Sequence, residues 1–108
     1  VKGPFLAVRA AVPAMRSRGG GSIIITSSIT GVRGAPCMAP YATSKHAVIG
    51  SMRSAAREFA AESIRVYTVN PSQAQTRMMR SIEAGMLPDD PAVAQQAMAA
   101  SIPMQRYA

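Results

Sequence analysis

A tyrosine and a lysine lie four residues apart near the middle of the chain, at Tyr41 and Lys45. In a helix, this spacing puts both side chains on one face. A phenol has a pKa of about 10, but a nearby ammonium favours the phenolate and lowers that pKa. The spacing therefore suits an acid–base pair. It suits an ordinary pair of side chains on a helix surface equally well.

Polar residues follow two apolar runs of the sequence. Segment 26–28 (Thr-Ser-Ser) comes directly after the isoleucine run 23–25, and segment 70–72 (Asn-Pro-Ser) follows the run 65–69. In an open parallel sheet, ligands bind beyond the carboxyl ends of the strands. The helix that carries the tyrosine and the lysine begins close to the same edge. We therefore expect a site where the strand ends meet the start of this helix.

Hydrophobic periodicity predicts the elements that position these residues. Apolar residues at helical spacing predict a helix over 2–18, which Pro13 is expected to kink or break early. The three β-branched residues 23–25, without alternation, predict a short strand buried on both faces, and 65–69 predicts a second strand. The remaining expected elements are a loop over 27–39, a helix from 40 to about 62, a short helix over 76–84 within the connection 71–90, and a helix over 91–101. This order indicates an α/β fold with a right-handed parallel β-α-β unit.

Composition excludes several classes of protein. The 108 residues are 48% hydrophobic and 16% charged, which indicates one small globular domain. The net charge of +7 is compatible with nucleic-acid binding, but the arginines are scattered without any run, so we do not expect a nucleic-acid partner. No stretch reaches the roughly 18–20 apolar residues of a membrane span, and the first residues do not resemble a signal peptide.

The single cysteine and the single histidine carry no evident chemistry. Cys37 has no partner for an internal disulfide, so we expect a cytoplasmic protein in which this side chain packs. His46 has no second candidate ligand near it in the sequence, so we expect no metal site.

Several motifs occur in order along the chain, and together they resemble the short-chain dehydrogenase/reductase family. In that family a buried strand ends in a Ser-x-x-Gly turn, and a Tyr-x-x-x-Lys motif follows at a fixed spacing. Here Ser28 and Gly31 form the first motif, and Ser28 lies thirteen positions before Tyr41. The stretch 69–76 resembles the next strand end with its cofactor-binding turn, and 103–106 resembles a later Pro-x-x-Arg stretch. The resemblance covers almost the whole sequence.

The resemblance implies a parallel-sheet Rossmann-type fold, of which this chain is the second half of a doubly wound sheet. The strands of the cofactor half are then expected upstream of residue 1. Residues 1–108 form a partial NAD(P)-binding domain in this interpretation, with 71–101 as the substrate loop and its helices.

The resemblance also implies roles for named residues. Tyr41 is the acid and base in the interconversion of a ketone and a secondary alcohol, and Lys45 lowers the pKa of Tyr41 and binds the nicotinamide ribose. Ser28 holds the substrate oxygen. The implied cofactor is NAD or NADP, bound by Tyr41, Lys45, Pro71, Ser72, Ala74 and Thr76. The implied substrate pocket is lined by Ile29, Thr30, Met38 and Met78.

Three positions depart from the family pattern: Ser72, Ser63 and Tyr67, which stands where an asparagine is frequent. Ser72 stands where a glycine usually follows the proline, and glycine reaches backbone angles that serine avoids, so the cofactor turn is expected to be altered. Ser63 also replaces a frequent glycine, before the second strand.

Other functions remain open at this stage. One alternative is an inactive fragment or degenerate homologue, and another is an epimerase or dehydratase of the related extended type. The spacing of Ser28 and the turn over 70–76 favour the simple reductase over the latter. We further expect a small-molecule carbonyl or alcohol substrate. A homodimer or homotetramer is expected through helices 2–18 and 40–62, because the second helix is rich in small residues.

Overall fold

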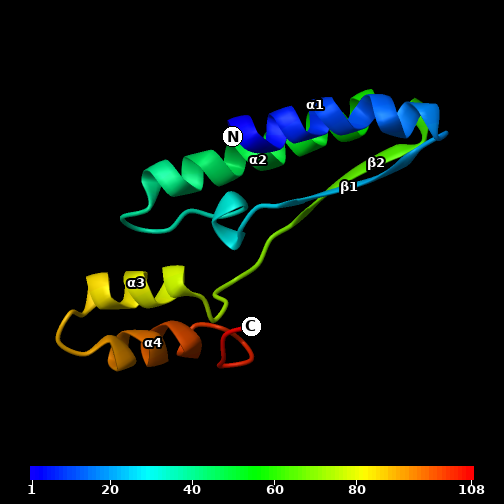
Figure 1. The fold of residues 1–108 in the computed structure, drawn as a ribbon. Coiled ribbons are helices and arrows are strands. Elements are labelled where there is room, and N and C mark those ends of the chain that lie inside the picture. Colours follow the sequence, from blue (N-terminus) through cyan, green and yellow to red (C-terminus); the bar gives the residue numbers. More distant parts are fainter. The chain divides into compact units, whose positions relative to one another are not determined.

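The computed structural model describes all 108 residues as two compact units, Val1–Pro71 and Ser72–Ala108. The elements of the first unit are α1 (Lys2–Ser17), β1 (Gly21–Thr26), the 3₁₀ turn η1 (Ile29–Gly31), α2 (Ala39–Glu58), the 3₁₀ turn η2 (Ala60–Glu62) and β2 (Ile64–Val69) (Figure 1). Those of the second unit are α3 (Arg77–Met86) and α4 (Pro91–Ala100).

The first unit contains the expected parallel β-α-β arrangement. β1 and β2 pair in parallel, in a register that runs from Gly21 opposite Ile64 to Thr26 opposite Val69. The connection between the two strands contains α2, which packs on β2. The α/β fold class and the order of elements predicted from the sequence are confirmed.

Helix α1 continues past its internal proline. Pro13 lies inside the helix, which ends only at Ser17, so the expectation of an early break is wrong. Proline removes a backbone donor and crowds the preceding turn. Val12, which precedes the proline, is part of the buried core, and Met15, which follows it, packs against that core. Packing on the sheet therefore keeps the helix continuous through the proline.

Helix α2 ends earlier than the periodicity predicts. It stops at Glu58, and η2 and a left-handed residue, Ser63 (φ 58°), turn the chain into β2. A single helix to residue 62 is therefore wrong. The left-handed region favours residues without a Cβ, which accounts for the glycine common at this position in the family. Here serine adopts it.

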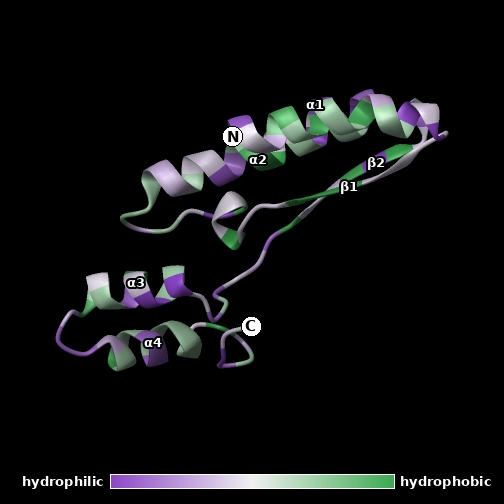
Figure 2. Ribbon diagram, viewed as in Figure 1, coloured by the Kyte–Doolittle hydropathy of each residue, from purple (hydrophilic) through white to green (hydrophobic).

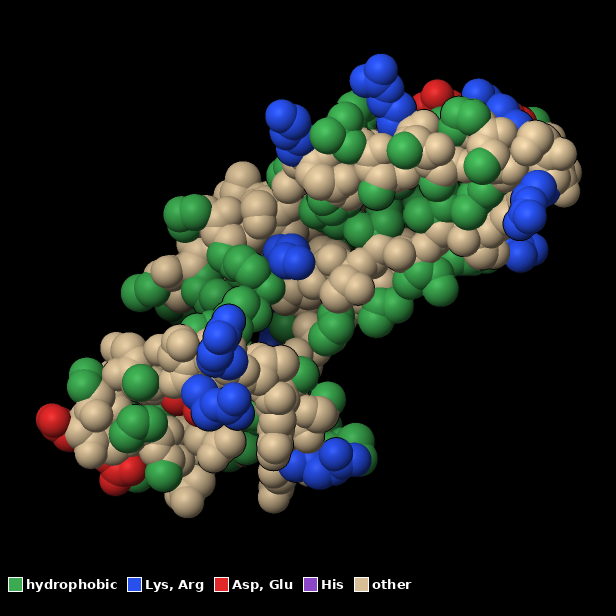
Figure 3. All heavy atoms as spheres, viewed as in Figure 1, with side chains coloured by type: hydrophobic (Ala, Val, Ile, Leu, Met, Phe, Trp, Pro, Cys, Tyr) green, Lys and Arg blue, Asp and Glu red, His purple; other side chains and the backbone are tan.

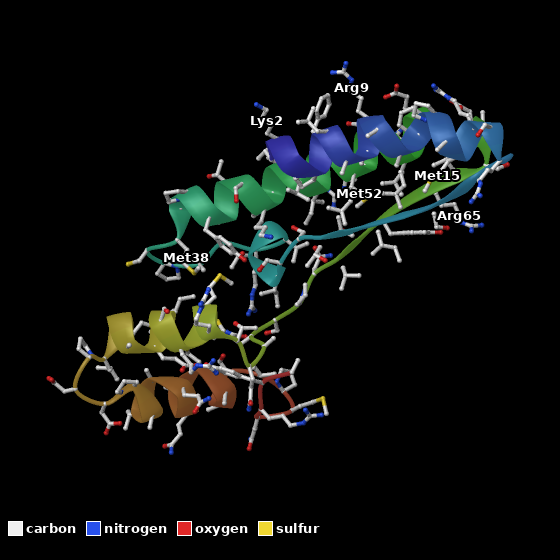
Figure 4. The ribbon with its side chains drawn as sticks, viewed as in Figure 1. Lys2, Arg9, Met15, Met38, Met52 and Arg65 are labelled. Atoms are coloured by element: carbon white, nitrogen blue, oxygen red, sulfur yellow. The ribbon has the colours of Figure 1, made fainter.

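A small apolar core lies between the two helices and one face of the sheet. Its buried members are Val12, Ala55, Ile64 and Val66. Figure 4 shows Met15 and Met52 beside this core, and both side chains pack against it, whereas Lys2 and Arg9 point away from the strands. Both helices therefore cover the same face of the sheet.

The opposite face of the sheet is exposed in this chain. Ile24 is 66% exposed, and Tyr67 and Val69 on β2 are exposed as well. Exposure alternates along both strands, although the middle of each is hydrophobic (Figure 2). The prediction of a strand buried on both faces is therefore wrong for these residues, because α1 and α2 lie on one side.

The surface shows no concentration of charge on the visible faces. Lys and Arg side chains are dispersed over them in Figure 3. Cys37 is exposed in the loop before α2, with a left-handed backbone (φ 58°), so the prediction that it packs is wrong. None of the helices is long and apolar enough to cross a bilayer.

The second unit consists of two helices that pack on each other. Both begin with a side-chain cap: Thr76 accepts from the Met79 amide (3.3 Å), and Asp90 accepts from the Val93 amide (3.3 Å). Pro91 follows the second cap, where its missing N–H costs nothing. The two helices predicted in this region are confirmed.

A glycine allows the turn after β1 to lie against α2. A Cβ at Gly31 would meet the Ser27 Oγ at 2.7 Å, the Ile49 Cδ1 at 2.9 Å and the Lys45 carbonyl oxygen at 3.0 Å. Its φ lies outside the left-handed region, so the position demands space rather than a special backbone angle. Any larger residue must push η1 away from the helix.

We therefore predict that Gly31→Ala lowers the free energy of unfolding by about 1–3 kcal/mol, as expected for overpacking. Urea denaturation measures the change. The matched control is Gly50→Ala on the outer side of α2, where the added Cβ meets nothing and removal of a helical glycine should stabilise by about 0.5–1 kcal/mol. Changes of the same sign in both variants would contradict this account.

Candidate active site

Ser28 caps the turn that follows β1. Its backbone is extended, its residue is only 8% exposed, and its hydroxyl oxygen accepts from the Thr30 amide (3.2 Å) and the Thr30 hydroxyl (2.9 Å). A serine hydroxyl has one proton to donate besides its lone pairs. Because the Ser28 oxygen accepts in both bonds, the hydroxyl proton of Ser28 can be donated to another group.

The end of β1 is tied to the second turn of α2. The Ser27 hydroxyl donates to the Lys45 carbonyl oxygen (3.1 Å), and the Lys45 ammonium approaches the Thr26 carbonyl oxygen (3.5 Å). Ser27 is thus a structural hydrogen-bond donor. Together with the close approach at Gly31, these bonds hold the Ser28 turn beside the helix that carries the lysine.

Tyr41 and Lys45 occupy the first two turns of α2. The lysine ammonium lies 5.6 Å from the centre of the tyrosine ring, a separation at which a cation interacts with the π-face. Pro40 stands at the start of the helix, where proline is tolerated. The two side chains share one face, and we refer to them with Ser28 as the Ser28–Tyr41–Lys45 cluster.

The chemical groups of this cluster suit a ligand that is rich in oxygen. An ammonium and two hydroxyl groups donate hydrogen bonds to carbonyl or hydroxyl oxygens, and the phenol also exchanges a proton. The ammonium is the one fixed positive charge among them. Such a set has the right donors for the ribose hydroxyls of a dinucleotide and for a small carbonyl compound.

The sequence did not reveal the part played by Thr30. Thr30 was expected to line a substrate pocket, but it is buried and its hydroxyl is turned to the Ser28 oxygen. The sequence feature that indicates this bond is the spacing of two hydroxyl residues, Ser28 and Thr30, around a turn, where such side chains hydrogen-bond locally. Ile29 and Met38 are half-buried at η1 and at the start of α2.

Pro71 joins the end of β2 to the same turn, because its carbonyl oxygen accepts from the Ile29 amide (2.9 Å). The ends of both strands are therefore bonded to η1 or α2. The sequence predicted that the strand ends would meet at one edge, and the first unit has this arrangement.

The other candidate cofactor residues belong to the second unit. Ser72 does not adopt a left-handed backbone, so the serine at this position imposes no strain, and its hydroxyl donates to the Gln73 side chain. Ala74 lies between two paired residues, and Thr76 caps α3. Met78 lies exposed on that helix.

A groove of the first unit lies away from this cluster. It has a volume of about 660 Å³ and runs between α1 and α2, with Phe5, Val8, Ser51 and Ser54 among its lining residues. None of the three residues of the Ser28–Tyr41–Lys45 cluster lines it. The groove is therefore separate from the polar groups that gather at the strand ends.

Comparison with known proteins agrees with the geometry. The family model described as short chain dehydrogenase matches residues 1–87. Oxidoreductase UcpA of Salmonella typhimurium is 38% identical over 109 residues, which cover 100% of this chain and 41% of that protein. The chain therefore spans about two fifths of this relative's length.

Solved structures share the fold. NAD⁺-bound xylitol dehydrogenase superposes with a TM-score of 0.89 at 35% identity, covering 99% of this chain and 44% of that one. L-sorbose reductase from Gluconobacter frateurii, in complex with NADPH and L-sorbose, gives 0.83 at 30% identity, covering 94% and 40%. With a family model that matches four fifths of its residues and with its motifs held at one edge of a parallel sheet, the chain belongs to the short-chain dehydrogenase family.

Proposed function

We propose that the full-length protein is an NAD(P)-dependent oxidoreductase that interconverts a ketone and a secondary alcohol. The observation that carries the proposal is the Lys45 ammonium, 5.6 Å from the Tyr41 ring and 3.5 Å from the carbonyl oxygen at the end of β1. The ammonium thus lies between a phenol that can exchange a proton and the end of β1, and ligands of parallel sheets bind at such strand ends.

The cofactor in this proposal is NAD or NADP, and the donor set of the cluster fits it. Lys45 donates to the ribose hydroxyls, and Ser72, Ala74 and Thr76 hold the nicotinamide amide and the adjacent phosphate. When bound, the nicotinamide gives a hydride to the substrate carbon or accepts one from it. A solved relative holding NAD⁺ and another holding NADPH support a nicotinamide cofactor of either kind.

Ser28 holds the substrate oxygen in this mechanism. Its oxygen already accepts two bonds from Thr30, so its proton is the part available to a ligand. A donor fixed before the reaction stabilises the negative charge that develops on a carbonyl oxygen as hydride is added. Thr30 orients this donor and does not itself need to touch the substrate.

Tyr41 moves the proton. In reduction its phenol gives the proton to the substrate oxygen, and in oxidation it takes the proton from the alcohol. The Lys45 ammonium places a positive charge on the same helix face, 5.6 Å from the centre of the Tyr41 ring. Because both residues lie on α2, the helix fixes the spacing of the Tyr41 phenol and the Lys45 ammonium.

The family match also bears on the alternatives. A family model described as a dehydrogenase, together with neighbours named dehydrogenase and reductase, supports simple oxidoreduction over the epimerase or dehydratase alternative. Ile29, Met38 and Met78 line the substrate pocket in this proposal. A cytoplasmic location remains our prediction from the lone cysteine.

We also propose that the protein forms a symmetric dimer or tetramer through α1 and α2. The groove between these helices is lined by apolar Phe5 and Val8 and by small Ser51, Ser54 and Ala55. Phe5 is exposed in the single chain. Small residues let a helix of a second copy approach closely, and an isologous contact closes with two-fold symmetry.

Tyr41→Phe in the full-length protein should reduce turnover by about 10²–10⁴-fold, because the ring remains while the proton donor is lost. Steady-state kinetics with NADH or NADPH and a panel of ketones measures the effect, and cofactor affinity should change little. Tyr67→Phe makes the same change on β2, outside the Ser28–Tyr41–Lys45 cluster, and is the matched control that should retain activity. Near-normal turnover of the Tyr41 variant would contradict the acid–base role.

Lys45→Met should raise the pH at which activity appears and weaken cofactor binding, because the variant lacks the positive charge and the ribose donor. The pH profile of kcat/KM and calorimetric titration with NADH and NADPH measure the two effects. His46→Gln changes the adjacent exposed residue, whose ring bonds the Ala42 carbonyl oxygen, and should leave both unchanged. An unaltered pH profile and affinity for Lys45→Met would refute this role.

Ser54→Arg should dissociate the assembly, because the long charged side chain fills the groove between α1 and α2. Light scattering coupled to size exclusion measures the mass. Arg57→Glu changes an exposed residue of the same helix outside the groove, and the assembly should keep the mass of the unsubstituted protein's assembly. A monomeric unsubstituted protein would refute the proposed interface.

A further inference from the structure

An acidic and a phenolic side chain are buried together in the second unit. Glu83 on α3 is 4% exposed, and Tyr107, near the end of the sequence, is 6% exposed. One carboxylate oxygen of Glu83, Oε1, is buried without a hydrogen-bond partner. Carboxylates are seldom buried unless they are paired, so this group calls for a reason beyond simple packing.

The two side chains line one small hollow. It has a volume of about 60 Å³, and its other lining residues are Gln75, Thr76, Met79, Arg80 and Gln95. Burial, and then the neighbouring Glu83 carboxylate, raise the pKa of Tyr107 to about 12. The phenol is protonated at neutral pH, and its hydroxyl donates to the Met98 sulfur (3.5 Å).

Tyr107 also lies next to a short backbone pairing. The Ala108 amide donates to the Gln73 carbonyl oxygen (3.0 Å), and the Gln75 amide donates to the Ala108 carbonyl oxygen (2.9 Å). These two bonds flank Ala74 on either side. The segment 73–75 is therefore held by the residue that directly follows Tyr107.

Tyr107 connects this pairing to both helices. Its hydroxyl contacts the Met98 sulfur of α4 (3.5 Å), and Tyr107 lines the same hollow as Glu83 of α3. Thr76, the next residue but one after Ala74, caps α3 from the same hollow. A shift of the Tyr107 ring must therefore displace the pairing around Ala74, the start of α3, or both.

We propose that Glu83 and Tyr107 are positioning residues that hold segment 73–76 in the conformation that binds the nicotinamide cofactor. The inference rests on the proposed function, which gives Ala74 and Thr76 to the cofactor. Neither Glu83 nor Tyr107 touches the cofactor in this account. They act through the backbone pairing at Ala108 and through the cap of α3.

Two conservative variants of the full-length protein test the proposal. Tyr107→Phe keeps the ring and removes the hydroxyl, and Glu83→Gln keeps the shape and removes the charge. Met104→Leu changes an exposed residue three positions before Tyr107 and is the matched control. Hydrogen exchange of the Gln75 and Ala108 amides is measured without cofactor, and dissociation constants for NADH and NADPH are measured by calorimetry.

We expect each variant to speed exchange of both amides at least tenfold and to weaken the better-bound dinucleotide at least tenfold. The KM for the cofactor should rise more than kcat falls, because the cluster on α2 is untouched. The control should match the unsubstituted protein. If one variant does not fold, the other still decides the matter, since each removes a different partner of the pair.

Two results would overturn the proposal. Unchanged exchange would mean that the pair does not hold the segment, and faster exchange with unchanged affinity would mean that it serves packing alone. If the unsubstituted protein binds neither NADH nor NADPH, the proposed function fails as well. The exchange measurement separates these cases because it needs no cofactor.

Discussion

The Ser27 hydroxyl donates to the Lys45 carbonyl oxygen, and the ammonium of the same lysine returns toward the Thr26 carbonyl oxygen. These contacts join the end of β1 to the second turn of α2 and so fix the distance between them. Gly31 makes the approach possible, because any Cβ there would meet the Lys45 carbonyl oxygen and the Ile49 side chain. The position of Ser28 relative to the lysine follows from them.

The core of the first unit supports this junction from one side only. α1 and α2 bury Ile64 and Val66 under Val12 and Ala55, while Ile24 on the other face stays exposed. At α1's end, Arg16 binds the Glu62 carboxylate and lies over the Phe59 ring, and this pairing lowers the pKa of Glu62. Exposed ion pairs of this kind add little stability, so the apolar contacts determine how the helices lie.

The second unit has little apolar core of its own. Its two short capped helices, α3 and α4, bury little apolar surface, and the loop that precedes them contains no helix or strand. The pairing of Ala108 with Gln73 and Gln75 gives this loop a partner. Tyr107 and Glu83 then anchor the pairing between the helices, at the cost of a buried carboxylate oxygen without a hydrogen bond.

Local chemistry in the sequence determined much of this protein: the helical spacing of Tyr41 and Lys45, the strands, the caps and the motifs that identify the family. Tertiary structure alone decided the rest. It carried α1 through Pro13, ended α2 at Glu58 and exposed Ile24, because these outcomes depend on which face another element covers. It also buried Glu83 near Tyr107, since contacts between residues distant in the chain leave no periodicity in the sequence.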